Sequence, residues 1–459
     1  MEQITKPNCG ARLDRLPDCR WHSSMFAIVA FGLLVCWSNA VGGLILAQLK
    51  ALGWTDNSTT ATFSAITTAG MFLGALVGGI IGDKTGRRNA FILYEAIHIA
   101  SMVVGAFSPN MDFLIACRFV MGVGLGALLV TLFAGFTEYM PGRNRGTWSS
   151  RVSFIGNWSY PLCSLIAMGL TPLISAEWNW RVQLLIPAIL SLFATALAWR
   201  YFPESPRWLE SRGRYQEAEK VMRSIEEGVI RQTGKPLPPV VIADDGKAPQ
   251  AVPYSALLTG VLLKRVILGS CVLIAMNVVQ YTLINWLPTI FMTQGINLKD
   301  SIVLNTMSMF GAPFGIFIAM LVMDKIPRKT MGVGLLILIA VLGYIYSLQT
   351  SMLLITLIGF FLITFVYMYV CYASAVYVPE IWPTEAKLRG SGLANAVGRI
   401  SGIAAPYAVA VLLSSYGVTG VFILLGAVSI IVAIAIATIG IETKGVSVES
   451  LSIDAVANK

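Results

Sequence analysis

Residues 79–88 read G-I-I-G-D-K-T-G-R-R and separate two apolar stretches, each long enough to cross a bilayer. The segment therefore places four charged side chains in one short hairpin at a membrane surface: Asp83, Lys84, Arg87 and Arg88. Gly82 and Gly86 are predicted to let the backbone turn there without steric cost. A degenerate copy, M-D-K-I-P-R-K, occupies residues 323–329, and its Asp324 lies 241 positions after Asp83. The repeated hairpin indicates a duplicated membrane protein.

Composition supports this interpretation. The chain has 459 residues, of which 56% are apolar and 12% charged, so a soluble globule is excluded. Twelve apolar runs have the length of a helical crossing: 25–49, 61–81, 89–107, 113–139, 148–170, 182–202, 266–291, 301–323, 331–348, 352–378, 390–416 and 418–441. The alternating pattern of membrane β-strands is absent, so the sequence predicts an all-α membrane protein.

The formal charge of +9 orients the chain and does not indicate nucleic-acid binding. Of 33 Lys and Arg residues, 28 lie in the N-terminal segment, the even-numbered loops, the C-terminal tail or nearby helix ends. Positive residues favour the cytoplasmic side, so we expect both termini in the cytoplasm. The seven cysteines have no metal-ligand spacing, and we expect no disulfide, no metal and no cofactor.

Charged landmarks repeat at nearly one offset, which indicates two six-helix bundles. Glu138 and Glu380 are 242 positions apart, as are Arg145 and Lys387. We therefore expect five regions: a cytoplasmic N-terminal segment (1–24), an N-terminal bundle (25–202), a cytoplasmic linker with short helices (203–265), a C-terminal bundle (266–441) and a cytoplasmic tail (442–459). The N-terminal segment has the composition of a short amphipathic stretch lying at the inner membrane interface.

The hairpin resembles the signature loop of the major facilitator superfamily, G-x-x-x-D-[RK]-x-G-R-[RK], at every specified position. P-E-S-P-R-W-L at 203–209 and I-E-T-K-G at 441–445 resemble motifs of its sugar-porter branch and of the organic-ion and niacin-type relatives, although Ile441 replaces the usual proline. The resemblance implies twelve transmembrane helices in two pseudo-symmetric six-helix bundles, the major facilitator fold, working by alternating access. In that fold, charged residues at the helix ends form a cytoplasmic network between the halves.

Thirteen residues match this conformational switch: Gly79, Asp83, Arg87, Arg88, Glu138, Arg145, Glu204, Arg207, Asp324, Arg328, Glu380, Lys387 and Arg389. Partly solvated ion pairs are each worth about 0–1 kcal/mol, which suits a switch. The alternative is that these charges only anchor the topology.

Buried charges within spans are candidates for function. Arg118 matches the fourth-span arginine of sugar porters, but the first-span stretch C-W-S-N-A-V-G (36–42) lacks the accompanying acid. Either an anionic substrate supplies the missing charge, or Arg118 extends to the surface. Arg399 resembles an anion-binding position of organic-anion carriers, or it joins the cytoplasmic network. Glu95 and His98, three residues apart, form either a proton-transfer pair or a satisfied pair between helices.

Polar residues of the seventh span complete the predicted substrate site. Asn277, Gln280, Tyr281 and Asn285 have helical spacing, and Pro288 follows. The paired glutamines of glucose-type porters are missing, which disfavours a simple hexose. The full predicted set is Asn39, Arg118, Asn277, Gln280, Tyr281, Asn285, Trp286, Tyr372 and Arg399, although an aromatic such as Tyr372 can also serve helix packing.

The sequence thus predicts a monomeric secondary transporter of the bacterial cytoplasmic (inner) membrane that imports a small polar organic metabolite, a sugar acid or sugar-like compound. Proton symport is implied by the resemblance. The alternatives are a uniporter or exchanger of a neutral sugar or polyol, a drug or metabolite exporter, and a nutrient receptor that does not transport. No nucleophile–base set or nucleotide-binding loop appears in the sequence, so neither an enzyme nor an ATP-driven pump is expected.

Overall fold

The chain is built from helices. The structure, a computed structural model, describes residues 7–17, 19–141, 145–240, 253–383 and 386–444, and every regular element in these ranges is helical. Nine helices within them are long and apolar enough to cross a membrane. These are α4 (Asn57–Thr85), α5 (Arg87–Ala106), α6 (Met111–Tyr139), α9 (Ala176–Tyr201), α13 (Gly260–Thr293), the pair α14 (Leu298–Met309) and α15 (Gly311–Val322), α16 (Arg328–Ser347), α17 (Met352–Val370) with its continuation η1 (Cys371–Tyr377) and α18 (Val378–Glu380), and α19 (Lys387–Ile439).

Two further predicted spans are broken, besides the eighth, in which Phe310 separates α14 from α15. The first consists of α2 (Arg20–Val35) and α3 (Gly42–Ala51), and the fifth of α7 (Arg145–Asn157) and α8 (Ser159–Leu170). The expectation of continuous helices was wrong at both places. Ser and Asn side chains in the first break compete for backbone hydrogen bonds, and Pro161 cannot donate to the carbonyl of residue 157.

The last helix, α19, contains two predicted spans. Its backbone is interrupted at Gly417, which has φ 64° and ψ −159°. This residue lies between the predicted runs 390–416 and 418–441, so the boundary between them is confirmed. With the two broken spans, the helices account for the twelve predicted crossings.

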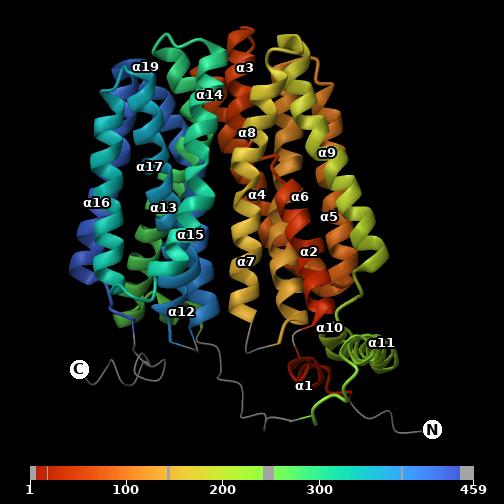
Figure 1. Cartoon of the computed structure of the whole chain (residues 1–459). Helices are drawn as coiled ribbons and strands as arrows, with labels where there is room; N and C mark the ends of the chain where they lie inside the picture. The colour runs from red at the N-terminus through yellow and green to blue at the C-terminus, as the bar shows by residue number, and fades with distance from the viewer. Residues whose placement is uncertain (1–6, 18, 142–144, 241–252, 384–385, 445–459) are drawn as a thin grey trace. The chain divides into compact units, whose positions relative to one another are not determined.

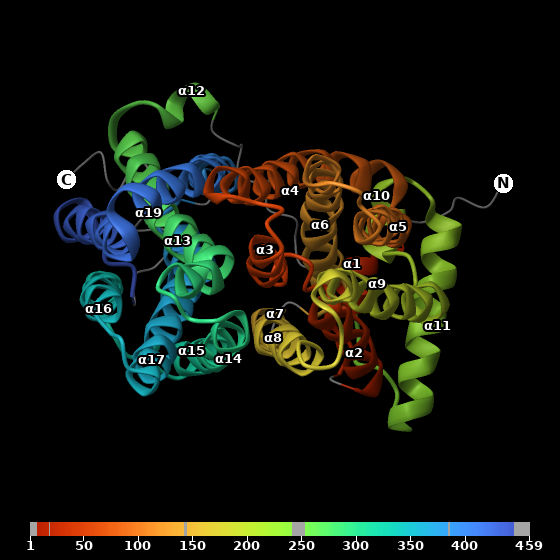
Figure 2. The same ribbon diagram turned by 90° about the horizontal axis from the view of Figure 1, so that it is seen from above.

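Contacts divide the chain into two compact units. The first comprises Met1–Asn39, Gly70–Ser159 and Leu184–Gly246, and the second Ala40–Ala69, Tyr160–Gln183 and Lys247–Lys459. The second unit thus joins α3 and α8 of the first repeat to helices of the second repeat. Within it, α13 packs along α19 and against α3 (Figure 2).

The duplication is visible in helix packing. A Cβ added to Gly70 or Gly74 of α4 would lie 2.3 Å or 2.1 Å from a backbone oxygen of α6, at Phe119 and Val123. In the second repeat, a Cβ added to Gly311 or Gly315 of α15 would lie 2.5 Å or 2.3 Å from a backbone oxygen of α17, at Phe360 and Thr364. All four residues are displaced by 241 positions, the offset of the two hairpins. Each repeat therefore packs this helix pair in the same way.

Four short helices belong to the N-terminal segment and the linker: α1 (Cys9–Asp14), α10 (Pro206–Ser211), α11 (Tyr215–Thr233) and α12 (Tyr254–Leu257). In the first unit, α1 lies beside α11 (Figure 1). Its apolar side chains are buried against α10 and α11. The apolar side chains of residues 9–16 thus contact the linker helices, and a position of this segment at the inner membrane interface stays a prediction.

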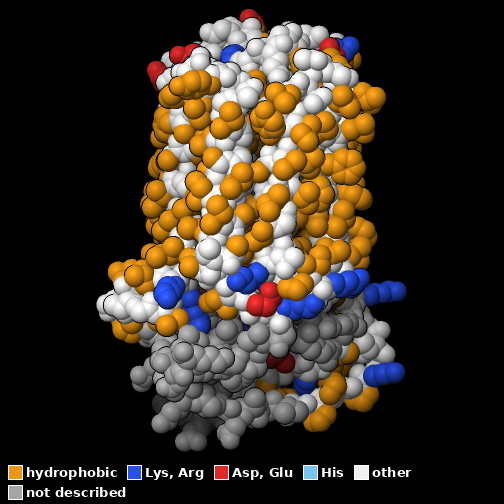
Figure 3. Space-filling model, turned by 90° about the vertical axis from the view of Figure 1, so that its left-hand side faces the viewer, with side chains coloured by type: hydrophobic (Ala, Val, Ile, Leu, Met, Phe, Trp, Pro, Cys, Tyr) orange, Lys and Arg blue, Asp and Glu red, His pale blue; other side chains and the backbone are white. Residues whose placement is uncertain are grey.

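An apolar surface covers the membrane helices. Figure 3 shows a face on which hydrophobic side chains extend along the helices, while Lys, Arg, Asp and Glu lie towards the ends. On α16 the exposed apolar residues include Ile337, Val341 and Tyr344. Such a surface has the character expected for contact with lipid chains.

Candidate functional site

The turn at the signature hairpin is made by one residue. α4 continues to Thr85 and α5 begins at Arg87, so only Gly86 lies between the helices, with φ +97°. A Cβ on Gly86 would lie 2.3 Å from a carboxylate oxygen of Glu204. Gly82 is part of α4 and does not turn the chain, which corrects its predicted role. A glycine is thus required at position 86 for two reasons: its positive φ angle and the close approach of the Glu204 carboxylate.

Arg87 is the centre of the first-repeat network. Its guanidinium forms ion pairs with Asp83, at 2.7 Å (Nη1–Oδ1), and with Glu138, at 2.8 Å (Nε–Oε1). The carboxylate of Glu204 accepts hydrogen bonds from the backbone N–H groups of Arg87 (2.7 Å) and Arg88 (3.2 Å). A carboxylate at the start of α5 also has a favourable interaction with the helix dipole.

The second repeat reproduces this network. Arg328 forms ion pairs with Asp324, at 3.3 Å, and with Glu380, at 3.0 Å. Glu442 accepts hydrogen bonds from the backbone N–H groups of Arg328 (2.8 Å) and Lys329 (3.1 Å). These contacts do not join the two repeats: Glu442 directly follows the second repeat, and Glu204, which serves Arg87 and Arg88, lies just after the first. A network between the halves stays a prediction.

The other predicted switch residues differ in whether they contact the two networks. Arg207 donates from Nε to the carbonyl of Glu138, at 3.0 Å. Lys387 is exposed, and the guanidinium of Arg389 lies 5.1 Å from the ring centre of Tyr254. A Cβ on Gly79 would meet no atom within 4 Å. The side chain of Arg145 lies outside the described part of the chain.

Glu95 and His98 belong to a buried chain of polar groups in the first unit. His98 Nδ1 lies 3.4 Å from Oε2 of Glu95, and His98 Nε2 lies 2.7 Å from the hydroxyl of Ser38. The backbone carbonyl of Ser38 accepts a hydrogen bond of 2.7 Å from Arg118 Nη1. All four side chains are at most 1% exposed. Oε1 of Glu95 is buried without a hydrogen-bond partner in the structure.

The break in the first span explains the position of Arg118. Residues 36–41 between α2 and α3 are not helical, so carbonyls there need other donors. Arg118 donates to one of them, and at 1% exposure it does not extend to the surface. The sequence left two alternatives, an anionic substrate or extension to the surface; in the structure the Arg118 guanidinium donates a hydrogen bond to a backbone carbonyl of span one.

Two glycines of α19 bring the stripe on α13 close to that helix. A Cβ on Gly398 would lie 3.0 Å from Nδ2 of Asn277, and one on Gly402 would lie 3.1 Å from the ring of Tyr281. Asn277 is buried and donates to the carbonyl of Leu273, four residues earlier in α13. Asn285, also buried, lies where α3 crosses α13, because a Cβ on Gly43 would lie 2.9 Å from the backbone oxygen of Asn285.

A tyrosine pair beside Gln280 was not predicted. The rings of Tyr160 (α8) and Tyr367 (α17) are 5.3 Å apart, and the amide of Gln280 lies next to the Tyr367 hydroxyl. Nearby on the chain, Ser164 accepts a hydrogen bond of 3.1 Å from Asn305. Asn305 carried a sequence signal, since it is an amide within an apolar span. For Tyr160 and Tyr367 the sequence contained no comparable signal.

The remaining predicted binding residues differ in their surroundings. Trp286 is fully buried among apolar side chains of α4 and α19, and Tyr372 stacks on Tyr377 at 5.0 Å, so both positions fit helix packing. Asn39 is half-buried in the break of the first span. Arg399 is half-buried on α19, and its Nη1 is buried without a hydrogen-bond partner in the structure.

Comparisons with known proteins identify close relatives and the fold. The chain is 44% identical over 455 residues to the inner membrane metabolite transport protein YdjE of Escherichia coli (strain K12), and the match covers 98% of this chain and 99% of that protein. It is 26% identical over 448 residues to the niacin transporter NiaP of Acinetobacter baylyi, with coverage of 96% and 99%.

Among solved structures, the partially occluded inward-open xylose transporter XylE from E. coli has a TM-score of 0.73 at 18% identity. The match covers 93% of this chain and 100% of that one, and it shows that the chain has the major facilitator fold. A family model described as "Sugar (and other) transporter" matches residues 24–455. The chain therefore belongs to the sugar (and other) transporter family of the major facilitator superfamily, and it is a membrane transporter of metabolites.

Proposed function

We propose that this transporter imports a small organic anion, a sugar acid or a similar carboxylate, together with a proton. The observation that carries the proposal is the buried chain of Glu95, His98, Ser38 and Arg118. A carboxylate and an imidazole in contact can hold one proton between them, and the free Oε1 of Glu95 can accept one.

The cost of burial supports this role. A buried polar atom without a partner costs about 1–3 kcal/mol, so a carboxylate oxygen in this state needs an explanation. Protonation of Glu95 removes a charge from the membrane interior. The break in span one includes Ser38, and the neighbouring Asn39 is half-buried, which supports entry of a proton at this break.

The choice of an anion rests on Arg399. Arg118 already donates to a backbone carbonyl, whereas Nη1 of Arg399 has no partner in the structure. A carboxylate suits a guanidinium, because two parallel hydrogen bonds can form. Asn277 and Tyr281, which face the same part of α19, would hydrogen-bond hydroxyl groups of the substrate.

Uptake into proteoliposomes tests the proposal. The probes are D-gluconate and D-galacturonate as sugar acids, D-glucose and myo-inositol as neutral compounds, and nicotinate. We expect a sugar acid to accumulate when the outside is made acidic, with a matching rise in internal acidity. One proton with one monoanion moves no net charge, so a voltage alone should not drive uptake. Neutral-sugar flux that ignores the pH gradient would instead establish a uniporter or exchanger.

We also propose that the transporter lies in the inner membrane with both termini in the cytoplasm, and that 25–202 and 266–441 move as two bundles. The contact of α1 with linker helix α11 supports part of this, since it requires the N-terminus and the linker to share one membrane side. Reporter fusions at the N-terminus, after residue 240 and at the C-terminus should all report the cytoplasm.

A further inference from the structure

The N-terminal helix α1 docks on the linker helices through a small apolar core. Cys9, Leu13 and Leu16 are fully buried and pack against Trp208 of α10 and against residues of α11. The α11 residues in this core are Ala218, Met222, Ile225 and Val229. A helix of six residues is not stable alone in water, so α1 depends on this surface for its structure.

Ion pairs fix the register of this docking. Arg12 pairs with both Glu219 and Glu226, and Arg15 pairs with Glu226 at 2.7 Å. The four side chains are between 11% and 31% exposed, so solvent screens them less than surface pairs. At the other end of α1, the carboxylate of Glu210 accepts hydrogen bonds from the N–H groups of residues 8 and 9, at 3.1 Å and 2.7 Å. It caps the helix from α10.

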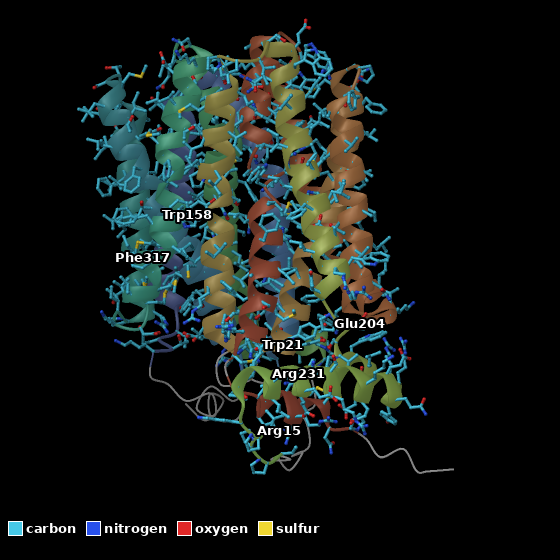
Figure 4. The ribbon with its side chains drawn as sticks, turned by 45° about the vertical axis from the view of Figure 1, so that its right-hand side comes forward. Arg15, Trp21, Trp158, Glu204, Arg231 and Phe317 are labelled. Atoms are coloured by element: carbon cyan, nitrogen blue, oxygen red, sulfur yellow. The ribbon has the colours of Figure 1, made fainter. Side chains whose placement is uncertain are left out.

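The same linker helix holds the signature turn. Arg207 of α10 contacts Asp14 of the N-terminal segment through Nη2, at 3.0 Å, and the carbonyl of Glu138 through Nε, at 3.0 Å. Trp208 donates from Nε1 to the carbonyl of Asp83, at 2.7 Å. One short helix therefore contacts both α1 and the Arg87 network; Figure 4 shows α1 and α11 together below Glu204.

We propose that α1 is a releasable clamp on the conformational switch. While α1 is docked, α10 is held against the signature turn, and opening of the Arg87 network is slowed. Release of α1 frees Arg207 and Glu210, so α10 detaches more often and the network opens more often. This inference concerns the first unit alone and does not depend on the substrate or on proton coupling.

Hydrogen exchange followed by mass spectrometry tests the clamp in the full chain, reconstituted in lipid nanodiscs. The variant is R12A/R15A, and the decisive peptide covers residues 83–90, which contains the two amides bonded to Glu204. We expect exchange there, and in residues 9–16, to rise about tenfold, because local opening precedes exchange. Arg231→Ala is the matched control: Arg231 is on the same α11, but it is 79% exposed and its pair with Glu227 is 3.5 Å long.

The Cys9 thiol provides a second readout. Burial, helped by the neighbouring Glu210 carboxylate, raises the pKa of Cys9 to about 12, so a docked α1 should react slowly with a maleimide. We expect faster labelling in R12A/R15A, and labelling near the wild-type rate in R12K/R15K, which keeps both charges and shows that the variant chain folds.

Two outcomes would overturn the clamp. If residues 9–16 exchange faster while residues 83–90 keep the wild-type rate, α1 is a local packing element without influence on the switch. If R12A/R15A leaves both peptides and Cys9 labelling unchanged, the ion pairs do not hold α1 in place.

Discussion

At the residue scale, the buried carboxylate of Glu95 leads to a first prediction. Glu95→Gln keeps the shape and a hydrogen bond to His98 but cannot bind and release a proton. We expect pH-driven accumulation to fall at least about tenfold, equivalent to about 1.4 kcal/mol, while exchange of substrate across the membrane persists. Uptake and counterflow measured on the same proteoliposomes separate the two. Equal loss of both would mean that Glu95 serves folding or binding instead of coupling.

Two glycines of residues 79–88 provide a second prediction at this scale: Gly86, which is a specified position of the signature motif, and Gly82, which is not. Gly86→Ala places a Cβ at φ 97° and ψ 162°, a region adopted almost only by glycine, which costs about 1–3 kcal/mol, and it displaces Glu204 from the start of α5. Gly82→Ala puts its Cβ at an ordinary 3.6 Å from the Thr131 hydroxyl. We therefore expect the Gly86 variant to unfold at a lower temperature and the Gly82 variant to behave like the wild type. A scan of thermal unfolding in detergent compares them, and similar losses would contradict the single-residue turn.

Sequence reasoning reached individual residues unevenly. Its predicted switch set contains the acids that form ion pairs with Arg87 and Arg328, because charges beside apolar runs are conspicuous, but it does not contain Glu442. It could not find that Ser38 would join His98 to Arg118, since this contact depends on where span one unwinds. It also assigned Tyr372 to the substrate, although Tyr367, five residues earlier, is the tyrosine beside Gln280. Helical spacing shows which residues share a face, but not which face meets which neighbour.

At the scale of elements, the crossing of α3 and α13 yields a third prediction. Pro288 has no N–H, so the carbonyl of Ile284 loses its helical donor, and Gly43 packs against that oxygen. A Cβ on Gly43 would lie 2.4 Å from it, so Gly43→Ala must separate two backbones at a cost of about 1–3 kcal/mol. A Cβ on Gly32 in α2 would meet no atom within 4 Å, so Gly32→Ala is the control. The temperature of thermal unfolding should fall only for Gly43→Ala.

The docking of α1 on α11 has a predictable pH dependence. Burial alone would raise the pKa of Glu226, but hydrogen bonds and charge from Arg12 and Arg15 outweigh it and leave this pKa below its usual value. A lowered carboxyl pKa contributes stability above the pKa of the unfolded chain, about 4.3, and loses it as the pH falls through the folded value. We expect hydrogen exchange of residues 9–16, corrected for the intrinsic rate, to stay constant from pH 7 to 5 and to rise at lower pH. Glu226→Gln should remove this acid step.

At the scale of the whole molecule, the sequence predicted the duplication well because the two repeats share hairpins and charged residues at nearly one offset. The breaks in spans one and five were missed, since hydropathy measures length and not continuity. The sequence also could not predict the division into compact units, because α3 and α8 belong to the first repeat by sequence but to the second unit by contacts. Which helices remain together is decided by packing between distant segments.

The duplicated networks support a final prediction about how the halves communicate. Arg87 and Arg328 have no partner in common among the contacts described, so their contributions to stability should add within about 0.3–0.5 kcal/mol. Arg87→Ala, Arg328→Ala and the double variant form the cycle, measured first by thermal unfolding. The transport rate of the same variants then tests the network predicted between the halves. If the two arginines interact across the halves in another state of the transport cycle, their effects on the activation free energy of transport will deviate from additivity by about 0.5–3 kcal/mol. If the effects on the activation free energy and on stability are both additive, the two networks are local, and each orders only its own repeat.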